Sequence, residues 1–169
     1  MPLHEAASRD YAALAELLLE HGANIEARAE NSLSTALHLA AQNGSEATAT
    51  LLINKGAYID AKDDLGYTPL HDASDQGHLG MVRLLARKGA NINAITDAGS
   101  TAISFAKKAG YGDIALYLVS RGADMEDHED LFELLIDPDA AERQIVRRAS
   151  NARSATTAML TSLGLETRR

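Results

Sequence analysis

Histidine recurs at one spacing along the chain, at His4, His38 and His71, which are 34 and 33 residues apart. Imidazole is both a metal ligand and a general base, so three equivalent histidines raise the question of metal binding or catalysis. Metal sites, however, set His and carboxylate ligands a few residues apart, and no such motif occurs. We expect these imidazoles to be structural, bonded to local backbone and hydroxyl groups, and we predict no metal and no cofactor.

The carboxylates of Asp72 and Asp75 form a second arrangement that could do chemistry, because they are three residues apart. Side chains at this spacing share one face of a helix, where a general acid and a general base can be paired. No nucleophile–base arrangement accompanies them. We expect both carboxylates to be solvated on a charged binding surface, and we predict no catalytic residues.

Three other features carry weaker signals. The glycines form neither of the two common phosphate-binding motifs. Arg147-Arg148-Ala149-Ser150 resembles a kinase site, although such short patterns are common by chance. The remaining histidines, His21, His78 and His128, are isolated, and we expect them to be exposed.

The glycines instead mark a repeat. The pair Gly-Ala occurs at 22, 56, 89 and 122, with separations of 34, 33 and 33 residues, and a leucine precedes each glycine by four residues. A period near 33 that runs along the chain indicates stacked structural repeats.

The third copy shows the local logic most clearly. Thr68 is a suitable helix N-cap, and Pro69 is suited to the first helical position because it needs no N–H there. The apolar spacing predicts a short helix that begins at Pro69 and ends near Gly77, and a second helix whose stripe includes Met81 and Leu85. Gly89 then fits a left-handed C-terminal cap.

This copy resembles the ankyrin repeat, with its D-x-x-G-x-T-P-L-H-x-A and L-L-x-x-G-A motifs, and the resemblance covers roughly residues 1–125. It implies an all-α ankyrin-repeat solenoid of four repeats, at about 1–27, 28–61, 62–94 and 95–125. Copy two lacks the proline and carries one extra residue in 28–34, in a loop without the expected glycine. Copy four lacks both proline and histidine, and places Lys107 where a small residue normally packs.

Residues 126–169 depart from the repeat, and we predict a helical C-terminal cap and tail. Leu131, Phe132 and Leu134 follow a helical spacing, and Asp137-Pro138 can begin a second helix. The end of a solenoid needs such a cover.

Composition narrows the class of partner. The net charge is −8, which argues against nucleic acid as a partner. There is no apolar run of membrane-spanning length and no cysteine. We expect an intracellular protein, cytoplasmic or nuclear, with no membrane association.

The resemblance also implies a binding face, because the first helices and hairpin tips of ankyrin arrays form the concave, ligand-binding side. Leu39 and Phe105 are apolar where exposure is expected; either neighbouring loops cover them or they bind a partner. The residues assigned to this face are Leu39, Gln42, Asn43, Asp64, Leu65, Tyr67, Asp72, Asp75, Gln76, Phe105 and Lys108.

We therefore predict a non-catalytic protein–protein interaction module whose partner has a basic or mixed basic–apolar surface. Two alternatives stay open. One is an enzyme or enzyme subunit with a pocket on the concave face. The other is a structural spacer from a longer ankyrin protein, since the first copy starts in the middle of its motif.

Overall fold

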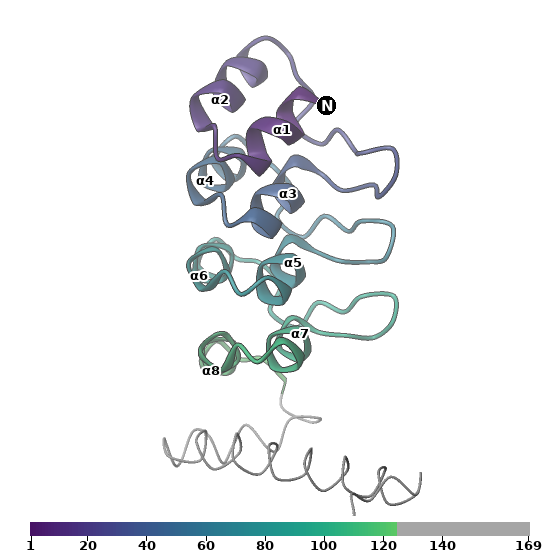
Figure 1. The fold of residues 1–169 in the computed structure, drawn as a ribbon, viewed down its shortest axis with the longest axis vertical. Coiled ribbons are helices and arrows are strands. Elements are labelled where there is room, and N and C mark those ends of the chain that lie inside the picture. The colour runs from purple at the N-terminus through teal and green to yellow at the C-terminus, as the bar shows by residue number, and fades with distance from the viewer. Residues whose placement is uncertain (125–169) are drawn as a thin grey trace, which may run out of the picture. The chain divides into compact units, whose positions relative to one another are not determined.

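The computed structural model describes residues 1–124 of the 169 in the chain, and these residues form four helix pairs joined by hairpin-like loops (Figure 1). Helices end after two or three turns because a glycine or a turn follows each one. The eight helices of this part of the chain are α1 Pro2–Ser8, α2 Ala12–Glu20, α3 Ala36–Asn43, α4 Glu46–Asn54, α5 Pro69–Asp75, α6 Leu79–Arg87, α7 Ala102–Ala109 and α8 Gly112–Ser120.

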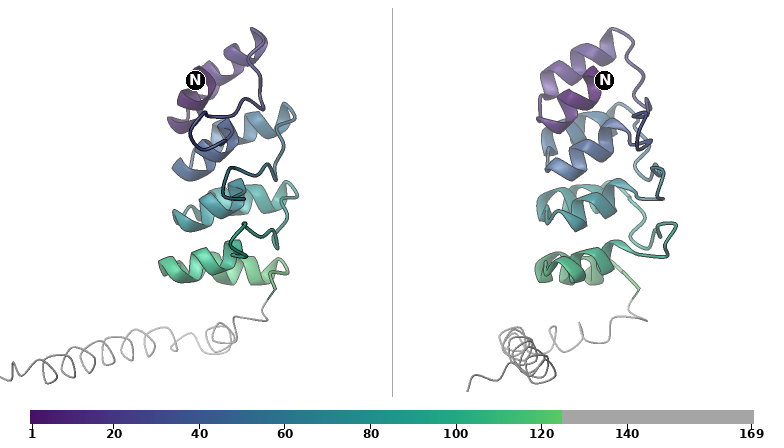
Figure 2. Two further views of the ribbon diagram at one scale, coloured as in Figure 1. Left: turned by 90° about the vertical axis from the view of Figure 1, so that its right-hand side faces the viewer. Right: turned by 45° about the vertical axis from the view of Figure 1, so that its right-hand side comes forward.

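The helices form two layers. The odd-numbered helices stack in one row and the even-numbered helices in a second row, while the hairpins project on the side of the odd-numbered row (Figures 1 and 2). The 95–101 hairpin has an antiparallel bridge between Ile95 and Thr101. This layout confirms the expected all-α solenoid, and it places the first helices and hairpins together on one side.

The first helices begin as the sequence predicts. Thr68 has an extended backbone and caps α5, Pro69 is the first helical residue, and His71 completes a reciprocal capping box. Thr35 and His38 do the same for α3. In α7, Ser104 replaces histidine in the box with Thr101, so the lost histidine does not remove the cap.

The core repeats in register from one helix pair to the next. In the second, third and fourth repeats, the first helix and the second helix each place a large aliphatic side chain at an equivalent position. All of these are at most 1% exposed: Leu37, Leu70 and Ile103, then Leu52, Leu85 and Leu118. Alanines fill the narrow spaces between helices, including Ala40, Ala73 and Ala106 at 0% exposure. Each pair therefore completes the core of its neighbour.

The first repeat departs from this register. Leu14 is 43% exposed, although Met81 and Ile114 at the same position are fully buried. Leu18 is half-buried where Leu52 is fully buried. The difference follows from position, since no described helix pair covers the outer face of α1 and α2.

Successive hairpins are joined through their backbones. The Asp64 N–H donates to the Ser32 carbonyl and the Asp97 N–H to the Leu65 carbonyl, each at 3.1 Å. The hairpin glycine has a positive φ, 76° at Gly66, and the second copy places Leu33 there at 53°. The missing glycine thus leaves the turn intact, but it puts a leucine in the left-handed region.

The predicted capping helices of residues 126–169, His128 and the motif at 147–150 lie outside the described residues.

We predict that Leu52→Ala or Leu85→Ala lowers the free energy of unfolding by about 2–5 kcal/mol, because each side chain is fully buried between repeats. Urea denaturation followed by circular dichroism measures this. Leu17→Ala, at a 51% exposed position, is the matched control and should change stability by less than about 1 kcal/mol. Equal losses at the three sites would contradict the shared register of the core.

The hairpin turn yields a second prediction. A Cβ at Gly66 would lie 2.7 Å from the Asp97 backbone nitrogen, so Gly66→Ala should destabilise the protein by about 2 kcal/mol or more. Leu33→Gly relieves left-handed strain but adds freedom to the unfolded chain, so it should be neutral or stabilising by up to about 1 kcal/mol. Thermal unfolding of both variants tests the pair, and a destabilised Leu33→Gly would show that the leucine side chain holds the loop.

Candidate functional site

The residues assigned to the binding face from sequence remain accessible in the structure. They lie on α3, α5 and α7 and at the hairpin tips, and none of them is fully buried. Leu39, Tyr67, Asp72, Asp75 and Phe105 are half-buried. The exposed ones are Gln42, Asn43, Asp64, Leu65, Gln76 and Lys108. We call this surface the first-helix face.

Asp72 is the most perturbed group on this face. Burial raises the pKa of its carboxyl from 3.8 to about 8, and the charges of Asp63 and Asp75 raise it further in the same direction. The expectation that Asp72 is fully solvated is therefore wrong. The cause is burial of the carboxyl, which disfavours its charged form, and no positive charge offsets this effect.

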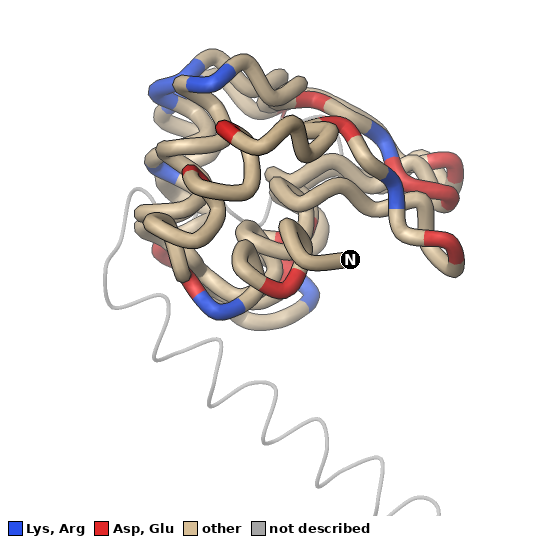
Figure 3. Tube along the Cα trace, turned by 90° about the horizontal axis from the view of Figure 1, so that it is seen from above, with Lys and Arg blue, Asp and Glu red and all other residues tan. Residues whose placement is uncertain are grey.

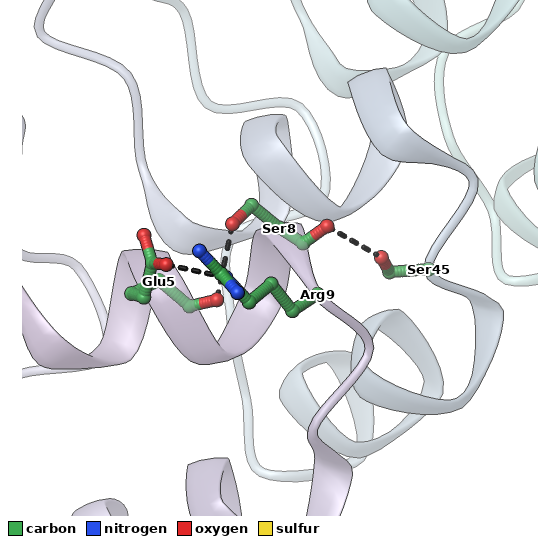
Figure 4. A network of polar contacts seen from close by, with 4 residues as sticks. All are labelled: Glu5, Ser8, Arg9 and Ser45. Carbon is green, nitrogen blue, oxygen red and sulfur yellow. Dashed lines mark hydrogen bonds and ion pairs between the residues drawn. The ribbon is translucent and has the colours of Figure 1, made fainter.

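The equivalent position in the first repeat holds an exposed carboxylate that has a cation beside it. Glu5 follows His4 as Asp72 follows His71, and the Arg9 Nε lies 2.5 Å from the Glu5 carboxylate (Figure 4). In the third repeat the residue at the Arg9 position is Gln76, whose amide bonds Asp75 instead.

The same network joins the first two repeats. Ser8 Oγ donates to the Glu5 carbonyl at 3.0 Å, and Ser45 Oγ donates to the Ser8 carbonyl at 3.5 Å. Within residues 1–124, the side chain of Asp72 makes no hydrogen bond and no ion pair. Its carboxyl is thus an unused acceptor on the first-helix face.

Two aromatic side chains meet on the first-helix face. The ring centroids of Tyr67, before α5, and Phe105, on α7, are 5.0 Å apart with an interplanar angle of 46°. Phe105 also meets the edge of His71 at 5.8 Å. Neighbouring rings therefore cover part of Phe105 and leave it half-exposed, and its role in binding stays a prediction.

The phenol of Tyr67 links the rings to the acidic groups. Its pKa is raised, first by burial and then by the charges of Asp75, Asp72 and Asp63. The three carboxylates thus act on one end of the aromatic pair. Sequence reasoning named Tyr67 and Phe105 as separate anchors, but their contact follows only from the stacking of consecutive repeats.

Histidine adds contacts that sequence reasoning missed. In His71, Nδ1 accepts the Thr68 N–H at 3.0 Å, so Nε2 carries the proton and donates to the Ala94 carbonyl at 3.0 Å. His38 does the same with Thr35 and the Tyr67 carbonyl. Burial lowers the pKa of both imidazoles. The local bonds were expected, but the bond to the next hairpin was not.

His78 is also more than an exposed residue. It is half-buried, its Nε2 lies 3.0 Å from the Gln42 carbonyl, and its ring packs over Gly44. The expectation that His78 is isolated and exposed is therefore wrong, because its ring contacts the preceding repeat. His21 is exposed, as predicted.

Charge is distributed unevenly around residues 1–124. Acidic residues lie at the hairpin tips and basic residues on the hairpin arms (Figure 3). Lys62, on one arm, donates to the Ile95 carbonyl at 2.8 Å and is thereby committed to the neighbouring hairpin. The tips are left acidic, and Leu65 is 61% exposed among them.

Two classes of site are not represented in the described part of the chain. Residues 1–124 contain no group of three or more His, Cys, Asp or Glu side chains placed to hold a metal ion. No helix in this range has the length and apolar character needed to cross a bilayer.

Comparison with protein families agrees with the architecture. A family model described as "Ankyrin repeats (3 copies)" matches residues 1–63 and again residues 58–129. Among curated proteins, no individual sequence is similar enough to count as a relative.

We predict that Asp72→Asn stabilises the protein, and more at pH 8 than at pH 5. The folded-state pKa is about 8 and the unfolded value 3.8, so between them the folded chain binds more protons and wild-type stability falls as pH rises. An amide avoids this loss. The stability gain from Asp72→Asn should increase by about 1–3 kcal/mol between pH 5 and pH 8, a range that is discounted because water still reaches the half-buried carboxyl.

Urea denaturation of wild type and variant at several pH values measures the difference, in which the histidine contributions cancel. Asp64→Asn, at an exposed tip, is the matched control and should show no such trend. A constant difference between wild type and Asp72→Asn would mean that Asp72 ionises normally.

Proposed function

Because the chain belongs to the ankyrin-repeat family, whose members are generally protein–protein interaction modules, we propose that it binds another protein through the first-helix face. We further propose that this face is the concave side of the array and that the partner presents a basic or mixed basic–apolar surface. No catalytic step is required for this role.

The single observation that carries the proposal is the unpaired carboxyl of Asp72. A half-buried acid with a pKa near 8 destabilises the folded chain, and its neighbours Asp63 and Asp75 increase that effect. Glu5, at the same register position, has its arginine within the repeat. An acid without a partner in the free protein is explained if a positive group of another molecule completes it.

The arrangement of the surface supports rigid recognition. Hydrogen bonds join consecutive hairpins, and capping boxes fix the starts of α3, α5 and α7. A face that is already stacked loses little conformational entropy on binding. Half-exposed Tyr67 and Phe105 add apolar area of the kind found in the centres of interfaces.

One observation favours an enzyme as a second candidate. A carboxylic acid with a pKa near 8 is suited to general acid catalysis at neutral pH. One depression, of about 280 Å³, is lined by Leu19, Ile25 and Lys55, with Glu20 and Ala23, and so lies at the C-terminal ends of α2 and α4 and not at Asp72. A binding face therefore accounts for more of the geometry than an active site does.

The proposal predicts that Asp72→Lys with Asp75→Lys weakens binding to a partner protein by at least ~10-fold at low salt, because complementary charge is replaced by like charge. Glu16→Lys with Glu20→Lys, on exposed positions of α2, introduces the same two lysines on the other helix layer. That control should keep the affinity within about threefold, with the small remainder from long-range attraction.

The partner is captured from native extract on immobilised protein, identified by mass spectrometry, prepared pure and titrated by calorimetry against all three proteins. Raising the salt to about 0.5 M should weaken wild-type binding most. Equal affinities for the two double variants would remove the first-helix face from the interface. Turnover of a small molecule that disappears in Asp72→Asn would support the enzyme instead.

A further inference from the structure

We propose that Tyr67, Phe105 and Asp72 form the seat of one arginine side chain of the partner, and that this arginine displaces a proton from the seat when it binds. This inference rests on the proposed function, which it makes specific. It assigns a chemical group to the centre of the first-helix face.

The rings provide a surface for a planar cation. Tyr67 and Phe105 come from consecutive repeats and pack at 5.0 Å with a tilt of 46°, which fixes both rings while each remains half-exposed. A guanidinium stacks on such ring faces by cation–π attraction. Arg83, on α6, already lies 5.6 Å from the ring centroid of Tyr117, on α8, so the same contact occurs between repeats elsewhere in this chain.

The acidic groups provide acceptors in more than one direction. Asp63 Oδ1 accepts the N–H groups of Leu65 and Tyr67 at 2.9 and 2.8 Å, and Asp75 Oδ2 accepts the Gln76 amide at 2.9 Å. One oxygen of each is left over, together with both oxygens of Asp72. A guanidinium has five donors in a plane and can bond one carboxylate with two of them.

The geometry favours arginine over the other cations. The carboxylates are not grouped as metal ligands in the described residues. A lysine ammonium is compact and strongly hydrated, so it gains less from two rings and separated acceptors. Charge complementarity and the aromatic pair together therefore select a planar organic cation.

Proton displacement follows from the surroundings of Asp72. The charges that raise its pKa are those of Asp63 and Asp75, and its own charge acts on Tyr67. Lys62, in the same repeat, acts on the neutral imidazole of His71 and bonds the Ile95 carbonyl. The buried His38 is the sole titratable group of α3, and the charged groups of α7 are Lys107 and Lys108. With a pKa near 8, Asp72 holds its proton at neutral pH in the free protein. A fixed cation at the seat favours the carboxylate and lowers that pKa.

The test uses two probes, the peptides acetyl-Gly-Arg-Gly-amide and acetyl-Gly-citrulline-Gly-amide. Citrulline has the shape of arginine but no charge. Nuclear magnetic resonance of the full chain follows the Asp72 carboxyl carbon and the ring signals of Tyr67 and Phe105. We expect the arginine peptide to shift all three and, near saturation, to lower the Asp72 pKa by at least about one unit.

Variants and the second probe separate the parts of the seat. The citrulline peptide should bind the wild-type protein at least ~5-fold more weakly than the arginine peptide does. The arginine peptide should bind the Asp72→Asn or Phe105→Leu protein at least ~5-fold more weakly than it binds wild type. The exposed-helix variant Glu16→Lys with Glu20→Lys should bind the arginine peptide within about twofold of wild type. If Phe105→Leu unfolds, the citrulline and Asp72→Asn comparisons still decide.

Two results would overturn the seat. One is an Asp72 titration curve that the arginine peptide does not move. The other is equal binding of the arginine and citrulline peptides. Failure of this inference is distinct from failure of the proposed function. Suppose that a captured partner binds the Asp72→Lys/Asp75→Lys protein more weakly, but that its binding to wild type releases no proton. The first-helix face would then still be the binding face, and the arginine seat would be wrong.

Discussion

No helix pair in residues 1–124 is large enough to bury its own apolar side chains, so stacking on the neighbours is the interaction on which the rest depends. Leu52 and Leu85 reach 0% exposure only because repeats lie on both sides of them, whereas Leu14 at the outer face stays 43% exposed. The repeat histidine provides a polar contact that also depends on stacking. His71 caps its own helix with Nδ1 and bonds the following hairpin with Nε2, so helix start and repeat spacing are fixed together.

Stacking also creates the candidate site. Tyr67 belongs to the hairpin before α5, Asp72 to α5 itself and Phe105 to α7, so the aromatic pair exists only where consecutive repeats are in register. The same packing removes water from Asp72 and raises its pKa. A change that loosened the third repeat from the fourth would therefore separate the rings and return the carboxyl to water, and the site would be lost before the fold.

Much of the fold could be predicted from the sequence because its signals are local. Thr68, Pro69 and His71 specify a helix start within four residues, and the leucine before each Gly-Ala marks the second helix. For the first-helix face, the sequence predicted which helix positions point outward but not the contacts between their side chains. The state of Asp72 could not be read, since its pKa depends on burial by other repeats and on Asp63, nine residues earlier. The Nε2 bonds and the packing of His78 over Gly44 were missed for a related reason, because each joins residues that are far apart in the sequence.

The comparison of Glu5 with Asp72 bears most directly on function. Both follow the repeat histidine, yet one has an arginine four residues later and the other has Gln76. An arginine at position 76 would have the same i, i+4 spacing from Asp72 that Arg9 has from Glu5. The third repeat, which lacks this ion pair, is also the repeat whose Tyr67, before α5, packs against Phe105, on α7, and both rings are half-exposed. An acid that weakens the free fold beside an aromatic pair that stays open is hard to explain by packing, and it is what a surface that acquires its positive charge from a partner requires.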